Sequence, residues 1–102
     1  MSDYLAKADR ERCPPHPGEV IDDILPATGM SKTQIAALLG ISRNQFHAIV
    51  AGKKPVSAYT AARLGKLFGN GPGLWLRLQA SFDAWHAERD VDVSDVPTIK
   101  AA

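Results

Sequence analysis

Residues that could read the edges of DNA bases are gathered at the start of one short segment, RNQFHA. Arg43, Asn44 and Gln45 are consecutive there. An Arg guanidinium can form two hydrogen bonds with guanine, and an Asn or Gln amide can form two with adenine. His47 and Ala48 follow, and an alanine is small enough to let a helix approach closely and contact a thymine methyl group. These residue types predict base recognition; the alternative is the solvent-exposed face of an ordinary helix.

Candidate contacts for DNA phosphates lie on both sides of that segment. The start of a preceding predicted helix offers free backbone N–H groups and the positive end of the helix dipole, which favour an anion. A pair of lysines follows the segment and could reach a phosphate, or could simply be solvated loop residues. The candidate phosphate contacts are Ser31, Lys32, Thr33, Ser42, Lys53 and Lys54. For Ser42, a role as a helix cap is the stronger alternative.

The charge distribution supports a nucleic-acid partner better than the net charge does. The formal net charge of the 102 residues is only +1. Residues 24–82, however, carry seven Lys or Arg and no Asp or Glu, whereas residues 1–23 and 83–102 each carry a net charge of −3. A basic surface without carboxylates is what phosphate binding requires. A chance excess of basic residues on a solvated face is the alternative.

Two helix-start signals position the polar residues. Ser31 with Gln34 forms the pattern of a capping box, and Ser42 with Gln45 repeats it eleven residues later. Gly40 between them can adopt the left-handed conformation that ends a helix. Two short helices joined by a three-residue turn, residues 39–41, constitute a helix-turn-helix. The second helix is expected to bury Phe46, Ile49 and Val50 and to expose the polar side.

The N-terminal part of the chain predicts an extended arm and one further helix. Prolines at three of the four positions 14–17 prevent a helix there, so residues 1–17 are expected to form the arm. A short amphipathic helix then follows from Gly18, with its apolar residues at helical spacing. Pro26 is expected to stop this helix.

The C-terminal half predicts two more helices. Ser57 precedes one that ends at Gly69, and Pro72 suits the first position of the next. Trp75 and Trp85 recur on that last helix with other apolar residues at spacings of three and four. Packing in the core or in a dimer interface explains them better than a ligand pocket does.

These elements predict an all-α fold of five helices around one core, with short extended tails at both ends. Residues 18–88 form the expected DNA-binding domain. Residues 89–102 form a C-terminal tail, whose alternating valines predict either a short strand or no regular structure.

Several other classes of protein are not supported by the residues. Cys13 is the only cysteine, which excludes an intrachain disulfide and a Cys-rich zinc site. His16, His47 and His86 are far apart and lack metal-ligand spacing. We expect no catalytic site, cofactor or metal, because no convergent carboxylates, activated nucleophile or phosphate-binding loop is apparent. The sequence also shows neither a secretory signal nor a run of apolar residues long enough for a membrane, so a cytoplasmic location is expected.

The sequence resembles a known family over residues 16–86. The stretch HPGEVIDDIL, followed by SKTQIAALLGISRNQFHAIVAGKKPVSAYTAARLGKLFGNGPGLWLRLQASFDAW, is similar to the HigA antitoxins, the VapI-like branch of the Cro/repressor helix-turn-helix proteins. The LGISR segment is common to many such repressors. The HPGE opening, TAARLGKLFG and the Trp75–Gln79 stretch are more specific to this branch. Gly71 departs from the family pattern, because relatives often have a capping Ser there.

The resemblance implies a lambda-repressor-like domain that forms a homodimer and represses its own promoter. It implies two further partners: double-stranded operator DNA and a HigB-like ribonuclease toxin that the protein neutralises. The family's base-reading positions correspond to Arg43, Asn44, Gln45 and His47. Its phosphate-contacting positions correspond to Ser31, Lys32, Thr33, Ser42 and Lys53.

Two alternative functions remain open from the sequence. The first is a stand-alone or prophage-type repressor that has no toxin partner. The second is a protein-interaction domain that keeps the fold but does not bind DNA. A basic toxin would be attracted to the acidic flanks, 1–23 and 83–102, although short acidic tails are common.

Overall fold

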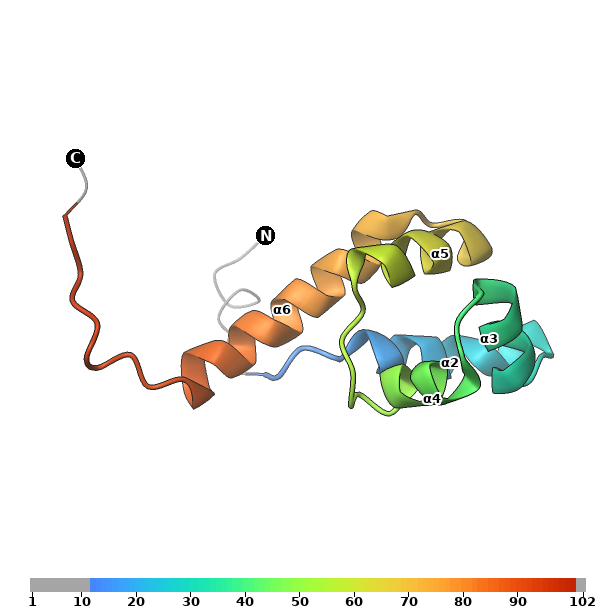
Figure 1. Cartoon of the computed structure of the whole chain (residues 1–102), viewed down its shortest axis with the longest axis horizontal. Helices are drawn as coiled ribbons and strands as arrows, with labels where there is room; N and C mark the ends of the chain where they lie inside the picture. The colour runs from blue at the N-terminus through green and yellow to red at the C-terminus, as the bar shows by residue number, and fades with distance from the viewer. Residues whose placement is uncertain (1–11, 101–102) are drawn as a thin grey trace.

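The structure, a computed structural model, describes residues 12–100, and in this part of the chain all regular structure is α-helical (Figure 1). The prediction of an all-α fold with five helices is therefore confirmed for these residues. The helices are α2 (Pro17–Thr28), α3 (Lys32–Leu39), α4 (Arg43–Val50), α5 (Ala58–Phe68) and α6 (Pro72–Asp90).

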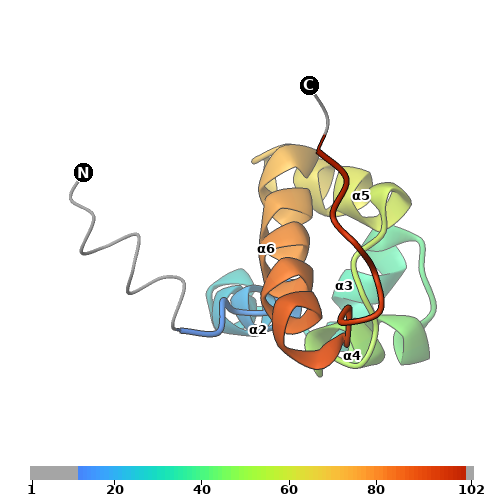
Figure 2. The same cartoon turned by 90° about the vertical axis from the view of Figure 1, so that its left-hand side faces the viewer.

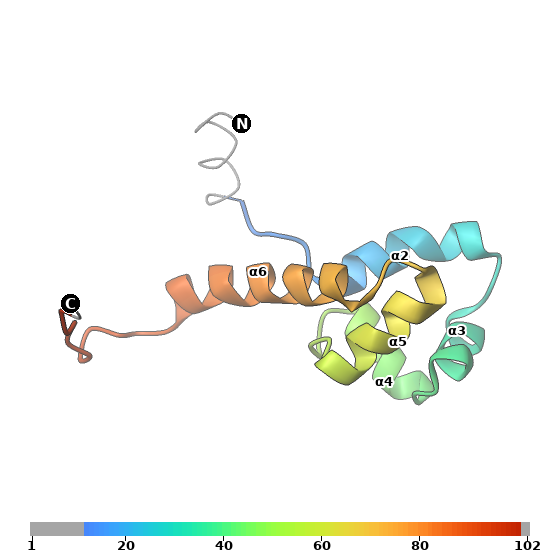
Figure 3. The ribbon, with the colours of Figure 1, turned by 90° about the horizontal axis from the view of Figure 1, so that it is seen from above.

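One hydrophobic core joins all five helices. α5 packs along the first half of α6 (Figure 2), and α2 and α3 each contact α4. The second half of α6 extends past the other helices (Figure 3). Burying each large apolar side chain contributes about 1.5–3 kcal/mol relative to leaving it in water. The largest fully buried apolar side chains are Ile21, Ile35, Leu39, Phe46, Ile49, Leu64 and Trp75.

The helix starts follow the capping signals, with one difference between them. At α3 the capping box is complete, because Ser31 Oγ accepts from Gln34 N at 3.1 Å and the Gln34 side chain accepts from Ser31 N at 2.8 Å. At α4 only half of it forms. Ser42 Oγ accepts from Gln45 N at 3.0 Å, and within the described chain the Gln45 side chain makes no return bond to Ser42. The prediction of two complete capping boxes was therefore wrong for the second.

The prediction that Pro26 stops its helix is also wrong. α2 begins at Pro17 and continues through Pro26 to Thr28, and Gly29 ends it with a φ of 67°. Pro26 lacks the N–H that would bond to the Asp22 carbonyl, but it lies in the last turn, so only two helical residues follow it. The Thr28 hydroxyl donates to the Leu25 carbonyl at 2.7 Å, and so satisfies one of the carbonyl groups in the last turn of the helix.

The two ends of the described chain are not helical. Residues 12–16 lead into α2, and the rest of the predicted N-terminal arm, residues 1–11, lies outside the described residues. Residues 91–100 follow α6 without forming a strand, so the alternative of no regular structure holds there. A single turn interrupts this stretch, in which Val96 N donates to Val93 O at 2.9 Å.

Candidate nucleic-acid interface

α4 is oriented as the sequence predicts. Phe46 and Ile49 are buried and Val50 is half-buried. The opposite side of the helix faces solvent, with Arg43 and Asn44 exposed in its first turn. This orientation follows from helical spacing, because three apolar residues on one side leave the remaining side to the polar residues. The first turn of α4 is therefore open to a ligand.

The position of α4 depends on close contact with the start of α2. Gly18 lies so near the end of α4 that a Cβ atom at residue 18 would overlap with the carbonyl oxygen of Ile49 and lie 2.7 Å from that of Val50. Glycine is required at this position because there is no room for a side chain, and not because its backbone conformation is unusual. This contact was not predicted from the sequence, because nothing local to Gly18 indicates which helix it meets.

His16 connects three elements around the same contact. Its Nδ1 accepts from Gly18 N at 2.9 Å and so caps α2. Its buried ring packs edge-on against Phe82 of α6, with 4.9 Å between ring centroids. Burial lowers the pKa of His16 below its usual 6.5, and a hydrogen bond with the backbone of Lys54 and the charges of two carboxylates oppose that shift in part. The interpretation of His16 as a helix-entry residue is confirmed.

The loop after α4 is held against the end of that helix. The backbone N–H groups of Lys53 and Lys54 both donate to the Ala48 carbonyl, at 2.8 and 3.2 Å. Both lysines are exposed. These bonds keep the backbone of both lysines next to the C-terminal end of α4, and a third lysine, Lys32, is the first residue of α3.

Six of the eleven predicted site residues line one groove. They are Lys32, Arg43, Asn44, His47, Ala48 and Lys53, and Val50, Ala51 and Asp22 complete the lining. The other five predicted residues do not line it. Ser31 and Ser42 are exposed helix caps, Thr33 is exposed in the first turn of α3, Gln45 is half-buried beside the groove-lining residues, and Lys54 is exposed in the loop.

No family model matches the chain, but individual proteins do. Virulence-associated protein A' of Dichelobacter nodosus is 40% identical over 75 residues, which cover 72% of this chain and 65% of that protein. The chain thus spans slightly less than two thirds of that relative's length. A solved addiction module antidote protein of the HigA family from Coxiella burnetii is 34% identical, with 87% of this chain and all of that chain covered and a TM-score of 0.75.

The chain belongs to the HigA family of helix-turn-helix antitoxins. Another solved structure is the antitoxin HigA of Pseudomonas aeruginosa with the higBA promoter, which is 27% identical to this chain. The match covers 83% of this chain and 96% of that chain, with a TM-score of 0.71.

In this HigA-family chain, Asp22 is the charged groove residue that sequence analysis missed. The acidic residues before position 24 were assigned to a flank separate from the basic middle. The fold places Asp22 on the groove because it lies one helical turn after Gly18, on the side of α2 that meets α4. A carboxylate there opposes the approach of a phosphate.

Other kinds of site are not built in the described residues. No three His, Cys, Asp or Glu side chains between residues 12 and 100 could together hold a metal ion. None of the described helices is long and apolar enough to cross a membrane. Trp75 packs wholly inside the core, which confirms core packing as its role.

Proposed function

We propose that this chain is a sequence-specific repressor that binds the operator of its own promoter and is the antitoxin of a toxin–antitoxin pair. One observation carries the DNA part: four predicted base-reading residues and two predicted phosphate-binding lysines line a single open groove. The Pseudomonas aeruginosa HigA with the higBA promoter, which shares this fold, supports the same assignment.

In this proposal α4 enters the major groove with its first turn leading. Arg43 pairs with guanine and Asn44 with adenine, because their side chains are exposed in that turn. Ala48, deeper along the helix, approaches a thymine methyl group, and Gln45 and His47 contact bases at the edges of the site.

Phosphates are held on both sides of α4. Lys32 binds from the α3 side, together with the free N–H groups of the first turn of α3 near Ser31 and Thr33. Lys53 and Lys54 bind from the loop side, where backbone bonds to Ala48 hold their chain segment in place. Ser42 already accepts the Gln45 N–H and can still donate its hydroxyl proton to a phosphate.

The partners follow from the geometry of a repressor. A homodimer with two-fold symmetry would place its two α4 helices on half-sites about 34 Å apart, or a multiple of that distance. A HigB-like ribonuclease is the proposed toxin, and the flanks with a net charge of −3 would attract a basic protein. Both activities would take place in the cytoplasm.

Titration of the protein with its own promoter fragment tests the DNA part. Arg43→Ala should cost about 1–3 kcal/mol of binding free energy, or about 5- to 150-fold in affinity, and should relax base preference at one position. The matched control is Lys66→Ala, which removes the same charge from an exposed position on α5 outside the groove. Equal losses in the two variants would contradict base recognition by α4.

The toxin part is tested separately by the neighbouring reading frame. A small basic protein that is lethal when expressed alone, and harmless with this chain, would support the antitoxin assignment. The absence of such a neighbour would leave a stand-alone repressor.

A further inference from the structure

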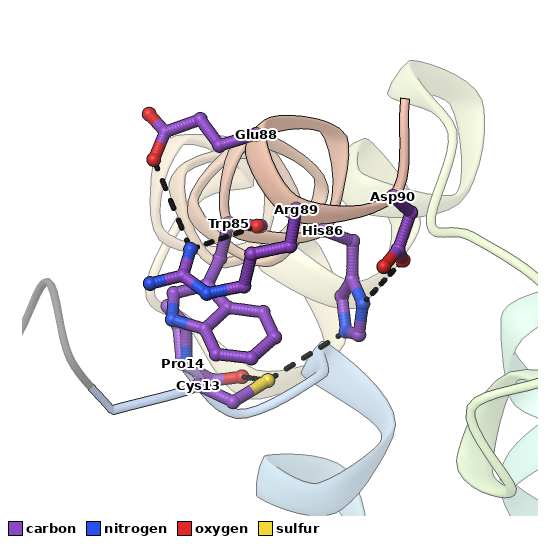
Figure 4. Close-up of polar contacts among 7 residues, drawn as sticks. All are labelled: Cys13, Pro14, Trp85, His86, Glu88, Arg89 and Asp90. Atoms are coloured by element: carbon purple, nitrogen blue, oxygen red, sulfur yellow. Dashed lines mark hydrogen bonds and ion pairs between the residues drawn. The ribbon is translucent and has the colours of Figure 1, made fainter. Parts of the chain in front are cut away.

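A second cluster of reactive side chains lies where the N-terminal arm crosses α6, away from α4. Cys13 Sγ is 3.6 Å from His86 Nε2, although the two residues are 73 positions apart in sequence. On the other side of the imidazole, His86 Nδ1 is 3.3 Å from Asp90 Oδ2 (Figure 4). The thiol is exposed. The order is therefore nucleophile, base and carboxylate.

This order determines which proton each group can carry. The Asp90 carboxylate accepts only, so it favours the tautomer with a proton on His86 Nδ1. That tautomer leaves Nε2 as an acceptor facing the Cys13 thiol. The thiol has a second acceptor, the Pro14 carbonyl at 3.4 Å. When the thiol proton moves to Nε2, the resulting imidazolium lies between a thiolate and a carboxylate. A nucleophile within reach of a base that a third group orients is the arrangement that activates thiols.

The fold holds the two sides of the cluster independently. The His86 ring is fixed by neighbours on α6, with centroid distances of 4.4 Å to Phe82 and 5.0 Å to Trp85. Cys13 is fixed from the arm, because two prolines stiffen the chain between it and the buried cap residue His16. The contact between thiol and imidazole is thus set by tertiary structure.

Cys13 is also one of the residues that line a cavity of about 420 Å³ between the arm and α6, large enough for a small molecule. Two features decide what could occupy it. Arg12 contributes a positively charged residue to the lining, and Leu78 contributes an apolar one. The remaining lining residues are Pro14, Pro15 and Ser81. The charge of this lining fits a small anionic molecule, and a thiol at its edge can exchange with one that contains a disulfide.

We propose that Cys13 is a modification site, at which the thiol activated by His86 exchanges with a small anionic disulfide. The thiol proton passes to His86 Nε2, and the sulfur electron pair attacks one sulfur of the disulfide R–S–S–R. The S–S bond breaks, and the leaving thiolate takes the proton from His86. The products are Cys13–S–S–R and R–SH, so Cys13 is oxidised and the small disulfide is reduced. This inference does not depend on DNA binding.

The test measures how fast oxidised glutathione modifies the folded protein at pH 7, by mass spectrometry. The matched control is the double variant Cys13→Ser/Ser81→Cys, which puts the only thiol on the same cavity away from His86. Wild type should react about tenfold faster than this control, because the thiolate is the species that attacks a disulfide and a neighbouring base helps to form it. His86→Gln should remove most of that advantage while leaving the helical circular dichroism unchanged.

Asp90 is a positioning residue, and its test needs a different measurement. Asp90→Asn should slow the reaction by a smaller factor than His86→Gln, and the ¹⁵N NMR signals of His86 should change from the Nδ1–H tautomer toward a mixture. Cystamine, a cationic disulfide, should react more slowly than oxidised glutathione, and Arg12→Gln should reduce that difference.

The proposal is overturned if wild type and the Ser81 control react at the same rate, or if His86→Gln reacts as fast as wild type. Equal rates for folded protein and protein in urea would overturn it as well, because the activation would then not come from the fold. None of these results would bear on operator binding, which is measured without a disulfide.

Discussion

Replacing Gly18 with alanine should destabilise the protein, although alanine normally stabilises a helix. In the interior of a helix the change is favourable by about 1 kcal/mol, which is an upper limit for Gly18 in the first turn of α2. Here a Cβ atom would overlap with the Ile49 carbonyl oxygen and lie 2.7 and 2.9 Å from the carbonyl oxygen and carbon of Val50. All of these are backbone atoms, so they cannot rotate away as a side chain could.

The magnitude follows from which atoms must move. Cβ atoms essentially never lie within 3.0 Å of other heavy atoms, so α2 and α4 must separate to admit the methyl group. Overpacking of this kind costs about 1–3 kcal/mol, and sometimes more. Because the obstacles are backbone, we expect the cost to reach the top of that range, which leaves a net loss of about 2 kcal/mol after the helix-propensity gain. For a domain of this size the melting temperature should fall by about 10 °C.

Thermal unfolding followed by tryptophan fluorescence is the assay, because Trp75 is buried in the core. The matched control is Gly73→Ala in α6, where the nearest atom to the new Cβ is the flexible end of Arg77, at 2.9 Å. That variant should be neutral or slightly stabilised. If Gly18→Ala were as stable as Gly73→Ala, the close packing of α2 on α4 would be refuted.

Three further predictions concern buried and charged groups. Because the pKa of His16 in the folded protein is below 6.5, the unfolded chain takes up the proton first on acidification. The free energy of unfolding should therefore not depend on His16 above about pH 6.5 and should decrease below that pH. Urea titrations from pH 5 to 8 should show a smaller decrease for His16→Asn, which keeps a capping side chain. Asp22→Asn should raise operator affinity about 2- to 10-fold at low salt and by a smaller factor at high salt. Asp23→Asn is the control, because Asp23 is adjacent but does not line the groove, and it should change the affinity little. Equal effects of the two variants would mean that only the net charge matters. Gln79→Leu should lower the free energy of unfolding, measured in urea, by about 1–3 kcal/mol. The buried Gln79 side chain accepts from Val56 N at 2.7 Å, and the Val56 N–H would lose this partner. An unchanged urea midpoint would show that the bond contributes nothing.

Local signals were enough to predict where most helices begin and end. Ser31, Ser42 and Ser57 all cap helices, and Gly40 and Gly69 end helices with φ of 73° and 76°. These residues act on backbone groups only a few positions away, so the sequence contains what is needed to interpret them. The prediction that Pro26 stops the helix was wrong because the effect of a proline depends on how many turns follow it, and α2 continues for only two residues after Pro26.

Contacts between distant segments could not be predicted. That Gly18 meets the end of α4, that Asp22 reaches the groove, and that Cys13 meets His86 are consequences of how helices pack. Charge counted along the chain separated Asp22 from the basic residues, while the fold brings it beside them. The six predicted residues that share one groove could be identified because α4 carries four of them at helical spacing.

NMR titration of the ¹⁵N-labelled protein with its own promoter duplex tests the central proposal most directly. Our account predicts that the largest chemical-shift changes occur at residues 43–48, with smaller ones at residues 31–33 and 53–54, and that a scrambled duplex perturbs mainly the latter two groups. If the largest changes fell on α6 or on residues 91–100, while the amides of α4 stayed unperturbed, the assignment of the DNA-binding surface would be contradicted.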